Sequence, residues 1–145
     1  MNLSKDVKIS QVLGYTAAGQ TAKTSNVIDM QGFAGVVFVA CLGTVTATSV
    51  VTLKAQQDIV NPMTDAKDLT GASVVNVVGA SNSNKCLVLD VYRPTKRYLE
   101  AVLTPATADS EILSMVAIQY QAGAMPTNID NSVLASILSV SPVEA

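Results

Sequence analysis

The fold is decided by one apolar run, Val36-Val37-Phe38-Val39-Ala40-Cys41-Leu42. Valine and phenylalanine favour an extended backbone, so the run predicts a β-strand. Because every position is apolar, we expect both faces of this strand to be buried, as in a central strand between two layers. Gly43-Thr44 follows as a turn.

Further strands are predicted after this run. Residues 51–56 alternate apolar with polar side chains, which predicts a strand with one face in water. Other strand-like runs cover residues 66–69, 73–78, 86–92, 97–103 and 111–121. In the last run, one face is expected to carry Ile112, Val116, Ile118 and Tyr120. Seven or eight strands at intervals of about 8–12 residues predict an all-β sandwich or barrel.

The composition excludes the commonest catalytic sites. The 145 residues include no histidine, so Ser-His and Cys-His nucleophilic pairs and imidazole metal sites cannot form. We therefore expect a non-enzymatic protein without cofactor or metal. Only 14% of the residues are charged and 49% are apolar, against about 25% charged in an ordinary soluble domain. Such a chain cannot easily cover its own surface, which favours a part of an assembly.

Nucleic acid and membrane are not expected partners. The net charge is -2, whereas a general affinity for nucleic acid requires a basic excess. The longest apolar stretch runs from Phe33 to Leu42, about half the length that a spanning helix needs. The start, Met1 to Asp6, turns polar at once and lacks the apolar core of a secretory signal, so we expect synthesis in the cytoplasm.

The two cysteines, Cys41 and Cys86, both lie in apolar strand-like runs. A small secreted scaffold carries several cysteine pairs, and this chain has one. We interpret both as buried free thiols, with a disulfide across the sandwich as the alternative.

Several weaker patterns favour a structural interpretation. The segment Gly14 to Thr21 has the spacing of a phosphate-binding loop, but Gln20 stands where that loop needs lysine, so we interpret it as part of an arm. A solvated loop accounts for Asp58, Asp65 and Asp68, whose spacing matches no calcium loop. Solvation at a turn and a strand edge accounts for Asp109 and Glu111.

Four of the nine basic residues lie close together, beside two tyrosines. The candidate contact residues for a partner are Lys85, Tyr92, Arg93, Lys96 and Arg97. Arginine suits bidentate pairing with carboxylates, so this stretch predicts contact with an acidic protein surface. A solvated hairpin connection and stacking on nucleic acid are the alternatives.

The two ends differ from the middle. Residues 1–25 are rich in Thr, Ala, Ser and Gln and are interpreted as an extended arm, residues 26–125 as the sandwich and residues 126–145 as a tail. An arm of this kind can add a strand to the sheet edge of a neighbour. In the tail, helical spacing links Val133, Leu134, Ile137 and Leu138, although interspersed serines weaken a helix. The tail docks either on a neighbour or on its own core.

The order of segments resembles a known family. Ile28 to Phe38 runs into Leu42-Gly43-Thr44-Val45, and Lys96 to Leu99 and Ala117 to Tyr120 come later. Together they resemble the small β-rich virion proteins that cement or decorate the capsids of tailed bacteriophages. The resemblance implies a jelly-roll-like β-sandwich that binds the outside of the major capsid protein shell and bridges capsomers, with no catalytic residues. A homodimer or homotrimer is expected, because the sites on a shell are symmetry axes.

Two other functions remain open at this stage. The first is another phage structural part, such as a tail, fibre or head–tail joining protein. The second is a carbohydrate-binding or hydrolytic β-sandwich module. Sugar sites generally present aromatic platforms, and this chain has no tryptophan and six aromatic residues in all, which favours the virion protein.

Overall fold

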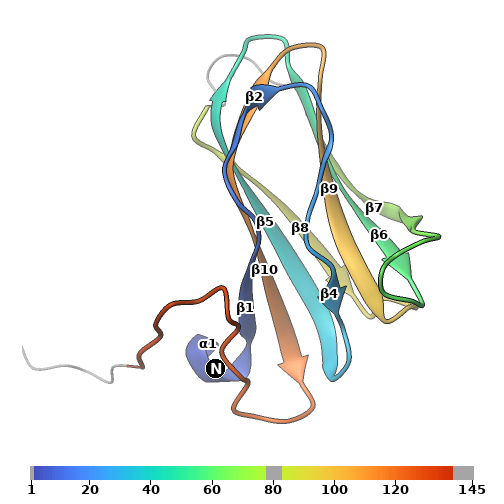
Figure 1. The fold of residues 1–145 in the computed structure, drawn as a ribbon, viewed down its shortest axis with the longest axis vertical. Helices are drawn as coiled ribbons and strands as arrows, with labels where there is room; N and C mark the ends of the chain where they lie inside the picture. Colours follow the sequence, from blue (N-terminus) through green and yellow to red (C-terminus); the bar gives the residue numbers. More distant parts are fainter. Residues whose placement is uncertain (1, 78–82, 139–145) are drawn as a thin grey trace, which may run out of the picture.

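The computed structural model, which describes residues 2–77 and 83–138, is a sandwich of two antiparallel sheets (Figure 1). Sheet A has the strand order β1-β10-β5-β8, with β2 also paired to β10, and sheet B has the order β3-β9-β6-β7, with β4 paired to β9. The elements are α1 (Leu3–Asp6), β1 (Lys8–Leu13), β2 (Thr16–Gly19), β3 (Lys23–Thr24), β4 (Ile28–Asp29), β5 (Phe33–Val45), β6 (Val50–Asp58), β7 (Lys67–Val77), β8 (Cys86–Tyr92), β9 (Tyr98–Ala106) and β10 (Ser110–Ala122).

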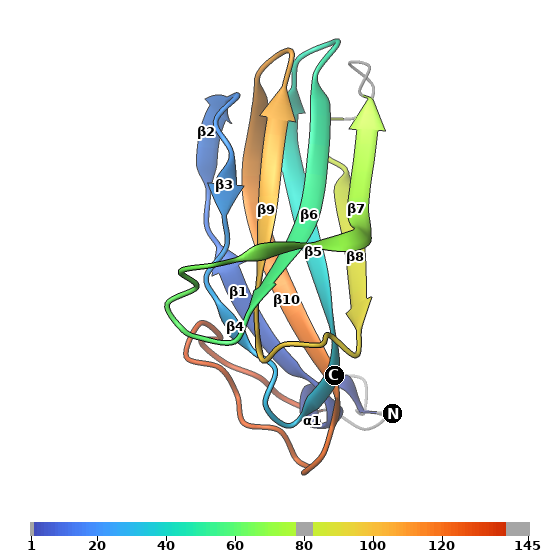
Figure 2. The same cartoon turned by 90° about the vertical axis from the view of Figure 1, so that its right-hand side faces the viewer.

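The predicted all-β jelly-roll-like sandwich is confirmed. The short strands β3 and β4 both pair with β9 and act as one interrupted strand. With these two merged and β2 set aside, eight strands form two four-stranded sheets, and the chain crosses repeatedly from one sheet to the other, as in a jelly roll. Figure 2 shows β9, β6 and β7 lying in front of β10, β5 and β8.

The core lies between the sheets and follows the predicted alternation. Val51, Leu53 and Ala55 of β6 are fully buried, while Thr52 and Lys54 between them are half-buried on the outer face of sheet B. The runs predicted over residues 66–69 and 73–78 form the single strand β7, and residue 78 lies outside the described residues.

One face of the apolar run in β5 is not covered. Val36, Phe38 and Ala40 are fully buried in the core, whereas Val37 and Val39 are only half-buried on the other side of the sheet. The expectation that both faces are buried is therefore wrong within this chain. The physical reason is that sheet A packs against sheet B on one side, and among residues 2–77 and 83–138 no further sheet covers the outer side of β5.

Strand β10 departs from the predicted face assignment. Ile112 is 1% exposed and belongs to the core, while Val116, Ile118 and Tyr120 face outward. The pairing of β10 with β5 shifts register on both sides of Ile112. A bulge adds a residue to one strand and reverses the alternation of the side chains that follow it, so the prediction for Ile112 is wrong.

The N-terminal segment is part of the sandwich, not an extended arm. β1 pairs with β10 over Lys8 to Leu13, and Ser10 and Val12 are 5% and 3% exposed in the core. Within the same segment, β2 pairs with β10 and β3 pairs with β9. Serine and threonine replace apolar residues at several positions of these strands, so their alternation is too weak to recognise, yet sheet pairing still orders them.

The tail does not form the predicted helix in its described part. Residues 126–138 have an irregular backbone with one turn and two bends and contain no helix, and residues 139–145 lie outside the described residues. Asp130 accepts hydrogen bonds from the backbone and side chain of Ser132, which gives the backbone an alternative to helical bonding. Over residues 2–77 and 83–138, no helix has the length and apolar character required to cross a bilayer.

Candidate partner-contact surface

The structure brings together four of the five predicted contact residues. Tyr92 ends β8, and Arg93, Lys96 and Arg97 follow in the connection to β9. Lys85 precedes the first residue of β8, so the length of that strand, about 23 Å at 3.3 Å per residue, separates it from the other four. Lys85 does not belong to the same surface.

Arg97 is already paired within the chain. Its Nε and Nη2 donate hydrogen bonds of 2.8 Å and 2.7 Å to the two carboxylate oxygens of Asp29. The Arg97 guanidinium is the main cause that lowers the pKa of Asp29, and it also lies 5.1 Å from the ring centroid of Tyr98. The bidentate carboxylate contact expected from a partner is therefore made by Asp29, where it joins β4 to the start of β9.

The other two cations border a hollow. Arg93 has φ of 50°, donates its backbone N–H to the Ala34 carbonyl, and places its guanidinium 5.2 Å from the Tyr92 ring centroid. The backbone N–H of Lys96 donates to Gln57 Oε1 at 3.2 Å. Residues 93–97 and the β4–β5 turn line an open hollow of about 480 Å³. The predicted basic residues that follow β8 thus form the rim of this hollow and do not make a flat surface.

A surface that the sequence analysis missed lies on the outer face of sheet A. It carries apolar side chains from three adjacent strands, which we call the valine patch: Val37, Val39, Val88, Val116 and Ile118. Val39 of β5 lies between its register partners Val88 of β8 and Val116 of β10. Val88 is 54% exposed. The signal was present in the wholly apolar run, but only the sheet pairing shows which half of that run faces outward.

An aromatic cluster flanks the valine patch. Tyr120 of β10 and Tyr92 of β8 have nearly parallel rings with centroids 6.4 Å apart. The Tyr120 side chain crosses Gly35 on the intervening strand and donates its hydroxyl proton to Asp90 at 2.7 Å. A Cβ at position 35 would overlap Tyr120 Cζ, so glycine is required for this close approach. Burial and the Asp90 carboxylate raise the pKa of Tyr120 to about 12.

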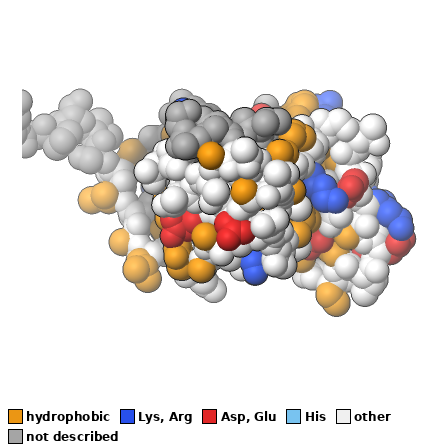
Figure 3. All heavy atoms as spheres, turned by 90° about the horizontal axis from the view of Figure 1, so that it is seen from above, with side chains coloured by type: hydrophobic (Ala, Val, Ile, Leu, Met, Phe, Trp, Pro, Cys, Tyr) orange, Lys and Arg blue, Asp and Glu red, His pale blue; other side chains and the backbone are white. Residues whose placement is uncertain are grey.

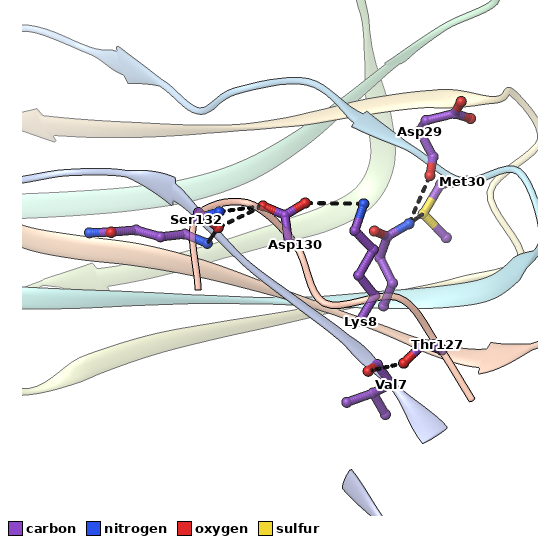
Figure 4. Close-up of polar contacts among 9 residues, drawn as sticks. Val7, Lys8, Asp29, Met30, Thr127, Asp130 and Ser132 are labelled. Carbon is purple, nitrogen blue, oxygen red and sulfur yellow. Dashed lines mark hydrogen bonds and ion pairs between the residues drawn. The ribbon is translucent and has the colours of Figure 1, made fainter. Parts of the chain in front are cut away.

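The C-terminal segment covers the β1 edge of sheet A. Thr127 Oγ1 donates to the Val7 carbonyl at 2.6 Å, and Ser132 Oγ accepts from the Gln11 backbone N–H at 2.9 Å. Figure 4 shows Asp130 between Lys8 and Ser132, and the Lys8 Nζ lies 3.1 Å from Asp130 Oδ2. Of the two docking alternatives, the structure shows this part of the tail on its own chain.

Asp130 is held ionised by these contacts. Partial burial alone would raise the pKa of its carboxyl group, but hydrogen bonds from Ser132 and the ion pair with Lys8 outweigh that effect and hold the pKa at about 2. Beyond this point the segment leaves the body of the sandwich. Leu134 and Ile137 are 102% and 87% exposed, and hydrophobic side chains are visible on the projecting segment in Figure 3.

The acidic residues considered as candidate sites have structural partners. Asp58 is 2% exposed, and its two carboxylate oxygens accept the backbone N–H groups of Ile59 and Asp65, which organises the loop after β6. Asp65 and Asp68 form ion pairs with lysines. The expectation of a solvated loop is wrong for Asp58, which is the last residue of β6 and is buried. Among residues 2–77 and 83–138, no group of three or more acidic or cysteine side chains is placed to hold a metal ion.

The segment Gly14 to Thr21 contains strand β2, and hydrogen bonds to Glu111 and Asp109 hold it in place. Glu111 accepts hydrogen bonds of 2.9 Å from the Tyr15 hydroxyl and the Thr44 backbone N–H. Asp109 accepts one of 3.0 Å from Gln20. Gln20 therefore has a partner within the chain, where a phosphate-binding loop would present a lysine to its ligand.

The cysteines are not buried. Cys86 is exposed and Cys41 is half-buried, and both lie on the outer face of sheet A as free thiols. They are direct cross-strand partners on adjacent strands, β5 and β8. The predicted burial is wrong, because register places Cys41 on the outward half of its apolar run, and a bond across the sandwich is excluded for the same reason.

Comparison with known proteins supports the fold alone. No protein-family model matches the sequence, and no curated protein matches it. Among solved structures, the PBSX exported protein XepA is similar to this chain, with 16% identity and a TM-score of 0.54. The similarity covers 97% of this chain and 46% of the XepA chain. The chain thus spans about half the length of XepA.

Two other solved structures are more weakly similar. Dimeric latent PorU from Porphyromonas gingivalis has a TM-score of 0.45 and 12% identity over 84% of this chain and 13% of PorU. Eiger TNF from S. frugiperda has a TM-score of 0.41 and 9% identity over 82% of this chain and 95% of that one. Both likenesses are too weak to support a conclusion about function.

Proposed function

We propose that this protein is a non-enzymatic structural part of a phage particle that binds the capsid exterior and cements neighbouring major capsid proteins. The fold is similar to that of the PBSX exported protein XepA along nearly the whole chain. The observation that carries the proposal is the valine patch on the outer face of sheet A. An antiparallel sheet with one solvated face normally carries polar side chains there.

The valine patch suits a protein surface as its partner. Its residues are contiguous across β8, β5 and β10, and a contiguous apolar area of this kind marks a contact site. The side chains stand on the sheet itself, so they are held rigidly and lose little freedom on binding. An apolar patch on a sheet face suits another flat protein face, as on a capsid shell, whereas small-molecule sites are concave.

The charge distribution around the patch supports the same partner class. Arg97 is engaged by Asp29, and the Asp90 carboxylate is engaged by the Tyr120 hydroxyl. Contact through the patch therefore requires no separate charge partner for either group. Arg93 and Lys96 on the neighbouring rim remain available to direct the approach of an acidic surface, and such rim charges change association rates more than affinity.

A pair of matched variants tests the patch. Val88→Asp puts a carboxylate within the proposed contact, on its most exposed valine, and we expect capsid binding to weaken by about 100-fold or more. Val75→Asp is the control, because Val75 is 59% exposed on the edge strand β7 of the other sheet, against 54% for Val88 on the edge strand β8. Occupancy on particles is measured by quantitative mass spectrometry of purified virions. Equal occupancy of both variants would contradict the proposal.

Location on the particle separates the capsid role from its rival. Electron cryomicroscopy of the virion is expected to show density for this chain on the outer shell, in copy numbers comparable to the major capsid protein. Density at the tail or portal vertex in few copies would favour another phage structural part. If the patch instead joins copies of this chain, sedimentation of the free protein will show an oligomer that Val88→Asp dissociates.

A further inference from the structure

Two thiols meet on the outer face of sheet A. Cys41 of β5 and Cys86, the first residue of β8, are direct partners in the antiparallel ladder, and their Sγ atoms are 3.1 Å apart. Cys86 is exposed and Cys41 is half-buried, so a dissolved reagent reaches the pair from the solvent side. The residues are 45 positions apart in the sequence, so only the sheet brings them together.

The ladder position suits a covalent bond. The backbone N–H of Leu42 donates to the Lys85 carbonyl at 2.9 Å, so Leu42 and Lys85, next to the cysteines in the ladder, form a hydrogen-bonded pair. Hydrogen-bonded and non-hydrogen-bonded pairs alternate, so Cys41 and Cys86 occupy a non-hydrogen-bonded pair, where Cα atoms are about 4.5 Å apart. That separation lies within the range of about 4.4–6.8 Å found for disulfides.

We propose that Cys41 and Cys86 are a dithiol site that closes into a cross-strand disulfide by exchange with a low-molecular-weight disulfide such as oxidised glutathione. The Cys86 thiolate attacks one sulfur of the small disulfide, forms a mixed disulfide and releases one small thiolate. The Cys41 thiolate then attacks the Cys86 sulfur and releases the second small thiolate. The two protons lost by the cysteines convert the small thiolates to thiols, so one disulfide is reduced as one is formed.

The attack begins at Cys86 because it is the more exposed thiol. The hydrogen bond with Cys41 and partial burial raise the pKa of Cys86, so a small fraction is thiolate at neutral pH and the exchange accelerates as the pH rises. The bond would fasten the start of β8, the edge strand of sheet A, to the central strand β5. The site lies on the same outer face of sheet A as the valine patch, but it does not rest on the proposed function, because its chemistry is tested on the free chain.

Redox titration of the full chain tests the site. The reduced protein is equilibrated in glutathione buffers of increasing oxidised fraction, quenched with an alkylating agent and analysed by mass spectrometry. We expect both thiols to disappear together, with a peptide that links Cys41 to Cys86, and the melting temperature to rise by about 10 °C. The single variants Cys41→Ser and Cys86→Ser should instead retain one glutathione.

Other results would overturn the site. They are two thiols that persist in fully oxidised buffer, a stable glutathione adduct on the unaltered chain, or a covalent dimer on a non-reducing gel. The double variant Cys41→Ser/Cys86→Ser controls for oxidation elsewhere, and its melting temperature should not respond to the buffer. Far-ultraviolet circular dichroism of each variant confirms that the sandwich is intact before titration.

Discussion

The Tyr120 hydroxyl on β10 donates a hydrogen bond of 2.7 Å to the Asp90 carboxylate on β8, across the intervening strand β5. The tyrosine ring reaches Asp90 by lying directly over Gly35, where a side chain is absent. Three strands of sheet A are thus connected on their outer face by one side chain. The contact lies beside the valine patch and holds the Tyr92–Tyr120 ring pair in place.

Gly35→Ala is expected to destabilise the protein by about 1–3 kcal/mol, the range for overpacking at a well-packed position. The new methyl group would overlap the Tyr120 ring, which is held at its far end by Asp90. Urea unfolding measures the change. Gly14→Ala is the control, because a Cβ at position 14 meets no atom within 4 Å. Tyr120→Ala should remove the overlap, so Gly35→Ala should cost less stability in the Tyr120→Ala background than in the unaltered chain. An equal loss of stability in both backgrounds would refute this cause.

Stability should fall as the pH rises from about 10 to about 12. The pKa of Tyr120 is raised to about 12 in the folded chain, against about 10 when unfolded, so folding favours the protonated phenol. This contribution is fully present below pH 10 and is lost as the pH passes through 12. Denaturant midpoints measured across this range check it.

Tyr120→Phe should flatten that dependence, because it removes the titrating hydroxyl. Tyr92→Phe is the comparison, since it leaves the bond between Tyr120 and Asp90 in place. The same slope in the unaltered chain and in Tyr120→Phe would show that another group is responsible.

Asp130→Asn should release the C-terminal segment from β1 at a cost of about 1 kcal/mol, the upper range for a partly exposed ion pair. In the unaltered chain, the pKa of Asp130 is about 2. Its stabilising contribution is therefore complete above pH 4 and is lost as the pH falls toward 2. Amide hydrogen exchange at Gln11 and Thr127 reports the release, because both amides bond across this contact.

Asp65→Asn is the control for that variant, since it removes a more exposed ion pair, with Lys67, in the loop between β6 and β7. Exchange at Gln11 that remains slow in Asp130→Asn would show that the ion pair does not hold the segment.

Deleting residues 1–25 should unfold the sandwich. The deletion removes β1, β2 and β3 and exposes the edge of β10 and much of β9, while Val12 and its neighbours leave the core. Circular dichroism and urea unfolding measure the loss. A control replaces Leu134 and Ile137 by serine, because both side chains are almost fully exposed, and it should unfold like the unaltered chain. A truncated chain with cooperative unfolding would show that residues 26–145 are sufficient for the fold.

Local pattern was enough to predict the all-β fold and the approximate positions of the strands from residue 36 onward, although the turn expected at Gly43-Thr44 lies within β5. Val51, Leu53 and Ala55 alternate with polar residues, and this period of two is a property of an extended chain against one core. The absence of histidine similarly excluded triads and imidazole sites without any structure.

The candidate surface could be predicted only in part. The three basic residues that follow β8 are neighbours in sequence, so they were expected to lie together with Tyr92, but the partner of Arg97 is 68 positions away at Asp29. The valine patch was hidden because a wholly apolar run does not show which of its faces is outward. Register decides that question, and register comes from pairing with distant strands.

Residue types and their spacing therefore established a β-sandwich with few charges and no histidine. The long-range pairing of β5 with β8 and β10 established the rest: Cys41 beside Cys86, Tyr120 over Gly35, and Ile112 inside while Val116 faces outward. The physical reason is that alternation is local to each strand, whereas the face that a residue occupies depends on bulges and partners far along the chain. A shift of one residue in pairing would have reversed every outward side chain.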